Sequence, residues 1–79
     1  MYFLVDYDRQ SGELISVRSF APEARVLAQV ARLELEVSLN AKGVDREVVI
    51  LEAEDEASLR ITHRRYFETV GLSVPAGQY

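Results

Sequence analysis

The sequence predicts an α+β fold of two layers, ββαβα in order, with a three-stranded mixed sheet and two helices packed on one of its faces. Two observations lead to this prediction. Residues 2–7, 13–20 and 47–52 are short segments rich in apolar, β-branched or aromatic residues, which is typical of strands. Residues 22–40 and 56–70 carry apolar residues three and four positions apart, which is typical of helices that pack on a sheet.

The composition indicates one small globular domain. The chain has 79 residues, of which 48% are hydrophobic and 28% charged, and this apolar share is too high for a disordered chain. We expect a single domain over residues 1–72 and a flexible tail over residues 73–79, where no periodic pattern continues. The chain has no cysteine, which excludes disulfide bonds and metal sites built on thiolates.

The charge and the first residues limit the environment. A net charge of −4 argues against binding driven by phosphate groups, which depends on clustered Lys and Arg. The apolar run Tyr2–Val5 is too short for a membrane span or for the hydrophobic part of a signal peptide. We therefore expect a cytoplasmic protein that neither binds nucleic acid nor enters a membrane.

The first two strands are predicted to form a hairpin, in which Gly12 takes the left-handed conformation that closes the turn. The first strand is apolar on both sides, as expected for a central strand. In the register that Gly12 sets, Ile15 and Val17 share a covered face with Phe3, Val5 and Tyr7. Leu14 is expected on the opposite face.

The third strand should lie beside the first. A strand, a helix and a second strand of one sheet are joined by a right-handed crossover, so residues 47–52 run parallel to residues 13–20. The likeliest free position is the other side of residues 2–7, antiparallel to them. The predicted strand order is therefore 2-1-3.

Each predicted helix has start and stop signals and one apolar stripe. Pro22 opens the first helix, and the second has Asp55 as its N-cap and Gly71 as its stop. The first stripe, expected to face the sheet, is formed by Val26, Val30, Leu33 and Val37. The second is formed by Leu59, His63, Tyr66 and Val70.

With both helices on one face, the other face of the sheet would be left open and would carry an apolar patch formed by Tyr2, Leu4, Leu14 and Phe20. Exposed apolar patches of this kind are typical of interaction sites. We therefore expect a small non-enzymatic interaction or regulatory module that forms a homodimer through this face, or binds another protein there.

A second hypothesis is a small domain that binds anions or nucleic acid. Arg60, His63, Arg64 and Arg65 form the basic cluster of the chain, and Arg60 and Arg64 are one helical turn apart. Two guanidinium groups at this distance could hold one phosphate or carboxylate. The simpler interpretation is a solvated helix face with Glu56 paired to Arg60.

A third hypothesis is a hydrolase built on Asp6 and Asp8. Asp6-Tyr7-Asp8 resembles the start of the haloacid dehalogenase phosphatase signature, in which one carboxylate attacks phosphorus and the second acts as acid and base. The resemblance covers these residues only, and the single lysine, Lys42, does not supply the later part of the signature.

Two further patterns bear on catalysis. The acids Asp6 and Glu34, with either Glu52 or Glu54, resemble the metal-binding carboxylates of ribonuclease H-like nucleases, but Glu34 lies beside a residue of the stripe expected to be buried. His63 is the single histidine, which excludes a histidine pair within one subunit. We expect no catalytic residue, metal or cofactor.

Overall fold

The computed structural model of the protein describes residues 1–68. The predicted end of the domain at residue 72, the stop at Gly71 and the tail over residues 73–79 lie outside this range.

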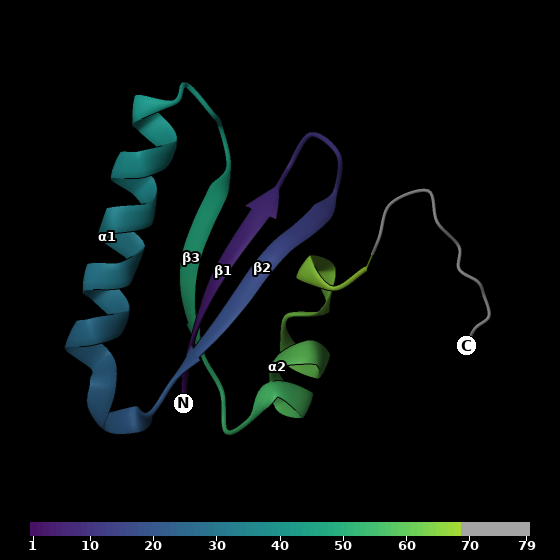
Figure 1. The fold of residues 1–79 in the computed structure, drawn as a ribbon. Coiled ribbons are helices and arrows are strands. Elements are labelled where there is room, and N and C mark those ends of the chain that lie inside the picture. The colour runs from purple at the N-terminus through teal and green to yellow at the C-terminus, as the bar shows by residue number, and fades with distance from the viewer. Residues whose placement is uncertain (69–79) are drawn as a thin grey trace.

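The described chain is an α+β domain, as predicted (Figure 1). Its elements follow in the order β1 (Tyr2–Asp8), β2 (Glu13–Phe20), a 3₁₀ turn η1 (Pro22–Ala24), α1 (Arg25–Ala41), β3 (Glu47–Glu52), α2 (Glu56–Thr62) and a second 3₁₀ turn η2 (Arg64–Tyr66). Neither helix in this part of the chain has the length and apolar character needed to cross a membrane.

The sheet has the predicted order, β2-β1-β3, with β1 in the centre. Its strands are all antiparallel to their neighbours, so the prediction of a mixed sheet was wrong. The crossover through α1 does return β3 in the direction of β2. However, β1 lies between these two strands and is antiparallel to both, so no parallel pair is hydrogen-bonded.

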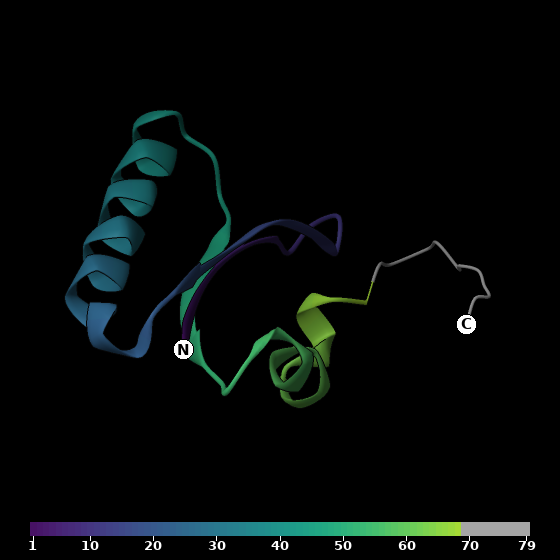
Figure 2. The ribbon, with the colours of Figure 1, turned by 60° about the horizontal axis from the view of Figure 1, so that its bottom comes forward.

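The two helices lie on opposite faces of the sheet (Figures 1 and 2), and the prediction of two layers with both helices on one face was wrong. Alternation along β1 puts Leu4 on the face of its neighbour Ile50, which lines a cleft together with Arg25 and Gln29 of α1. On the other face Val5 and Tyr7 pack against Tyr66 of η2. Both sides of β1 are therefore covered, which explains its two-sided apolar sequence.

The hairpin of β1 and β2 contains a β-bulge that changes the predicted register. Asp6 pairs with Ser16, but Tyr7 pairs with Leu14, so Ile15 is the extra residue. Leu14 therefore joins the cluster around Val5 and Tyr7, whereas Ile15 is 43% exposed. The prediction had these two residues on the wrong faces, because one inserted residue reverses the alternation.

Two glycines have the positive φ that their turns require. Gly12 has a φ of 71° and closes the hairpin, as predicted, with its N–H donated to the carbonyl of Asp8. Gly43 has a φ of 69° and follows the last turn of α1, where its N–H is donated to the carbonyl of Asn40. These turns set the directions in which the chain enters β2 and leaves α1.

The second helix begins as predicted and ends earlier. Asp55 is its N-cap, with Oδ1 accepting the N–H of Ser58 at 2.8 Å. The helix ends at Thr62, and His63 has a φ of −126°, outside the helical range. Arg60 and Arg64 therefore do not lie on one continuous helix.

Candidate interaction surface

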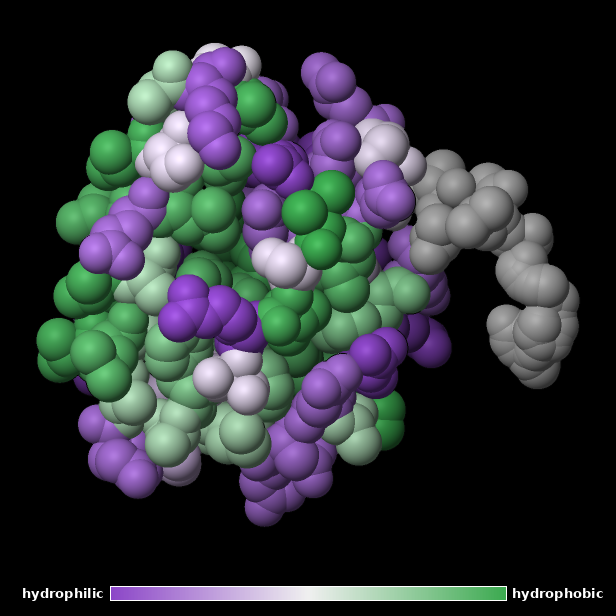
Figure 3. Space-filling model, viewed as in Figure 1, coloured by the Kyte–Doolittle hydropathy of each residue, from purple (hydrophilic) through white to green (hydrophobic). Residues whose placement is uncertain are grey.

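The most prominent surface feature is a row of large apolar side chains on the outer side of α1. We call it the outer stripe; its members and exposed fractions are Val26 (73%), Leu27 (65%), Val30 (46%), Leu33 (59%) and Val37 (60%). Figure 3 shows hydrophobic residues gathered along the side of the molecule that α1 forms. The prediction that Val26, Val30, Leu33 and Val37 face the sheet was wrong.

The sheet is contacted instead by a face of α1 with smaller side chains. Ala28 and Leu39 are buried there, and Ala31 and Leu35 of the same face are half-buried. Alanine has a short side chain, which lets the helix axis lie close to the strands. Each residue of the outer stripe and the residue two positions further along the chain are about 200° apart around the helix. The outer stripe and the buried face therefore lie on opposite sides of α1. Thus α1 is apolar on two opposite sides and buries one of them within the chain.

The charged residues beside the outer stripe balance one another. Arg25, Arg32 and Glu34 are exposed, and Glu36 is half-buried. Arg32 Nε lies 4.0 Å from Glu36 Oε1, one helical turn away. The charged residues of α1 therefore sum to zero, although the chain as a whole carries −4.

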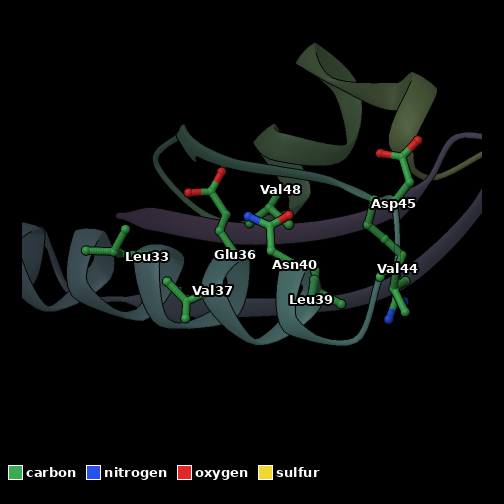
Figure 4. Close-up of a pocket in the computed structure, with 10 residues that line it drawn as sticks. Leu33, Glu36, Val37, Leu39, Asn40, Val44, Asp45 and Val48 are labelled. Carbon is green, nitrogen blue, oxygen red and sulfur yellow. The ribbon is translucent and has the colours of Figure 1, made fainter.

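A groove of about 510 Å³ adjoins the outer stripe at the carboxyl end of α1 (Figure 4). Leu33 and Val37 belong to both features, and Val44, in the connection to β3, extends the apolar lining. Glu36 and Asn40 lie on the side of α1 that faces Val48 of β3. The groove is thus apolar where it meets the stripe and polar toward the sheet.

The four residues predicted to form an interface do not form one patch. Leu4 is buried beneath α1, and Leu14 packs on the opposite face, against the cluster of Val5, Tyr7 and Tyr66. Tyr2 and Phe20 are cross-strand neighbours and half-buried, and the guanidinium of Arg18 lies 5.0 Å from the centre of the Phe20 ring. The open sheet face on which this prediction depended is covered by α1.

Two of the arginines near α2, Arg60 and Arg65, contact carboxylates and aromatic rings. Arg60 Nη2 lies 2.8 Å from Glu56 Oε2, and its guanidinium is 4.6 Å from the centre of the Phe67 ring. His63 Nδ1 is 3.0 Å from Thr62 Oγ1. Arg64 is exposed and lies in η2 rather than in α2. The pair of Arg60 with Glu56 is the one that the simpler interpretation of the sequence expected, and it leaves less positive charge for an anionic ligand.

A polar cluster on the α2 side of the sheet was not predicted. The hydroxyl of Tyr66 and Nη2 of Arg65 both donate to Oε2 of Glu47, the arginine at 2.7 Å. The hydrogen bond from Tyr66 holds the pKa of Glu47 below its ordinary value. Because Glu47 and Tyr66 are far apart in sequence, local spacing gave no signal of this contact.

The two aspartates of the Asp-x-Asp motif have different surroundings. Asp6 is buried, with Oδ2 3.6 Å from Arg46 Nη1, and its Oδ1 has no hydrogen-bond partner among residues 1–68. Asp8 accepts the N–H of Gln10 at 3.0 Å and stabilises the hairpin turn. Within residues 1–68, no group of three or more acidic or histidine side chains is placed to hold a metal ion.

Comparison of the chain with models of protein families, with curated protein sequences and with solved structures found no match. Any function proposed for this protein must therefore follow from its own surfaces.

Proposed function

We propose that this protein is a small non-enzymatic interaction module whose contact surface is the outer stripe of α1. The observation that carries this proposal is that five large apolar side chains of one helix are exposed, while a face richer in alanine is buried on the sheet. Contiguous apolar residues on a surface are typical of protein contact sites. The proposal keeps the class of function expected from the sequence and moves the contact surface from the sheet to the helix.

The residue types in the outer stripe support a contact role. Three of its members are valines, and valine is a poorer helix former than alanine or the long polar residues, because its branched side chain loses rotamer freedom in a helix. An exposed helix face with no partner gains nothing from these valines. Burial of these valine side chains against another surface would offset the free energy that their low helix propensity costs.

The double substitution Val30→Gln and Leu33→Gln tests whether the stripe is a surface. At concentrations too low for association, we expect the free energy of unfolding in urea to change by less than about 1 kcal/mol, because neither side chain supports the protein's own core. Binding of an apolar dye to the folded protein should decrease.

Leu39→Gln is the matched control, because Leu39 lies on the buried face of the same helix. It should destabilise the protein by about 2–4 kcal/mol. If the double variant were as unstable as this control, the outer stripe would be part of the core and the proposal would fail.

A further inference from the structure

We infer that the partner of the outer stripe is a second copy of this chain, packed α1 against α1 about a two-fold axis. This inference rests on the proposed function of the stripe and adds the identity of the partner. Two properties of α1 support it, the spacing of the apolar residues and the charges beside them, and the length of the helix sets how strong the association can be.

The spacing is that of a helix that pairs with a helix like itself. Successive members Val26, Val30, Leu33 and Val37 are four, three and four positions apart, which is the heptad spacing of a two-helix seam. Val30 and Val37 take position a. Val26 and Leu33 take position d. Valine at a and leucine at d are residues that favour two-stranded pairing.

The charges beside the seam permit self-association. Two copies of a chain with a net charge of −4 repel each other, and the repulsion is smaller where the facing surfaces carry charges of both signs. In this heptad Glu34 takes position e and Glu36 takes position g, and Arg32, one helical turn before Glu36, offsets the charge of Glu36 at 4.0 Å. A surface that carries charges of both signs can pack against its own copy about a two-fold axis. A partner with a strong charge of one sign would meet no surface of opposite charge there.

The size of the surface predicts a weak dimer. The 17 residues of α1 extend over about 26 Å, and one helix of this length presents less area than the ~800 Å² per partner of a standard interface. We therefore expect dissociation in the micromolar range. Val44 and the adjoining groove would enlarge the contact at the carboxyl end of α1.

The first test is the mass of the protein in solution, measured by sedimentation from about 1 µM to about 1 mM. The unmodified chain should form dimers as the concentration rises. Leu33→Glu should raise the dissociation constant by about 100-fold or more, because it places a charge at the centre of an apolar contact. Gln10→Glu adds the same charge in the exposed hairpin turn and should leave dimerisation unchanged.

A monomer at every concentration would overturn the inference, and so would a dimer that Leu33→Glu does not weaken. Neither result would affect the stability comparison of the double variant with Leu39→Gln, so the proposed contact surface and the proposed partner can fail separately.

A second test does not depend on the folding of the glutamate variant. The natural chain has no cysteine, so Val30→Cys and Leu33→Cys each introduce a single thiol. On mild oxidation of a mixture of the two, we expect disulfide-linked dimers, 30 to 30 and 33 to 33 for parallel helices or 30 to 33 for antiparallel ones. Gln10→Cys should cross-link much more slowly. A dimer that forms without cross-linking at either helix position would exclude pairing through α1.

Discussion

Asp6 is a buried carboxylate with few partners. In the described part of the chain, Oδ1 of Asp6 and Nε of Arg46 have no hydrogen-bond partner, and Arg46 approaches Oδ2 of Asp6 only to 3.6 Å. Burial raises the pKa of Asp6 above its ordinary value of 3.8, Arg46 opposes this shift, and the carboxylate of Asp8 adds to it. The folded protein therefore holds this proton to a higher pH than the unfolded chain does. The contribution of Asp6 to stability falls as the pH rises through that range.

Asp6→Asn should remove this dependence on pH. The free energy of unfolding of the native protein, minus that of the variant, should decrease as the pH rises above about 4, the ordinary pKa of an aspartate. Urea denaturation at several pH values measures both.

Asp8→Asn is the control for the sign of this effect. Hydrogen bonds from the N–H groups of Gln10 and Ser11 lower the pKa of Asp8, so its stabilising contribution is lost as the pH falls. The free energy of unfolding of the native protein, minus that of Asp8→Asn, should therefore increase as the pH rises. An increase in the Asp6→Asn series would contradict the assignment of Asp6 as a carboxyl destabilised by burial.

At the level of the element, α1 shows what apolar spacing does and does not determine. The spacing predicted a helix in the right place, and the structure confirms it. It did not determine which side of the helix meets the sheet, because both sides have apolar residues four and three positions apart. The larger residues were expected inside, and the fold buries the alanine-rich side instead.

The bulge in β2 is a second feature that spacing could not predict. A bulge depends on how two strands pair, and alternation within one strand does not report it. Its consequence is that Leu14 packs on the cluster around Val5 and Tyr7 while its neighbour Ile15 is 43% exposed.

Alanine substitutions at these two neighbouring positions should therefore differ in effect. We expect Leu14→Ala to destabilise the protein by about 2 kcal/mol, because it leaves a void beside Tyr7. Ile15→Ala should cost less than about 1 kcal/mol. Chemical denaturation of both variants measures the difference. The opposite ranking would show that β1 and β2 pair in regular register.

For the whole molecule, the strand order 2-1-3 could be predicted because the handedness of crossover connections leaves few choices. The three-layer arrangement could not. The face that α2 covers is decided by the path of the chain after β3 and by contacts such as Tyr66 with Tyr7, whose rings meet at 5.2 Å. Those contacts join residues far apart in sequence.

Coverage of both faces of β1 predicts how stability is distributed. The strand is hydrogen-bonded on both edges and packed on both faces, so its amides should exchange with solvent only through the largest unfolding events. We expect hydrogen exchange, followed by mass spectrometry or NMR, to be slowest in residues 3–7 and faster in β2. Equal or slower exchange in β2 would contradict a central position for β1.

The two apolar sides of α1 also affect which substitutions this protein can accept during evolution. Side chains on opposite sides of a helix point away from each other, and substitutions with no shared partners usually have additive effects on free energy. The side on the sheet, centred on Ala28, is constrained by folding. The side of Val30 and Leu33 is free of that constraint, so binding specificity could evolve on one half of the helix without loss of the fold that the other half supports.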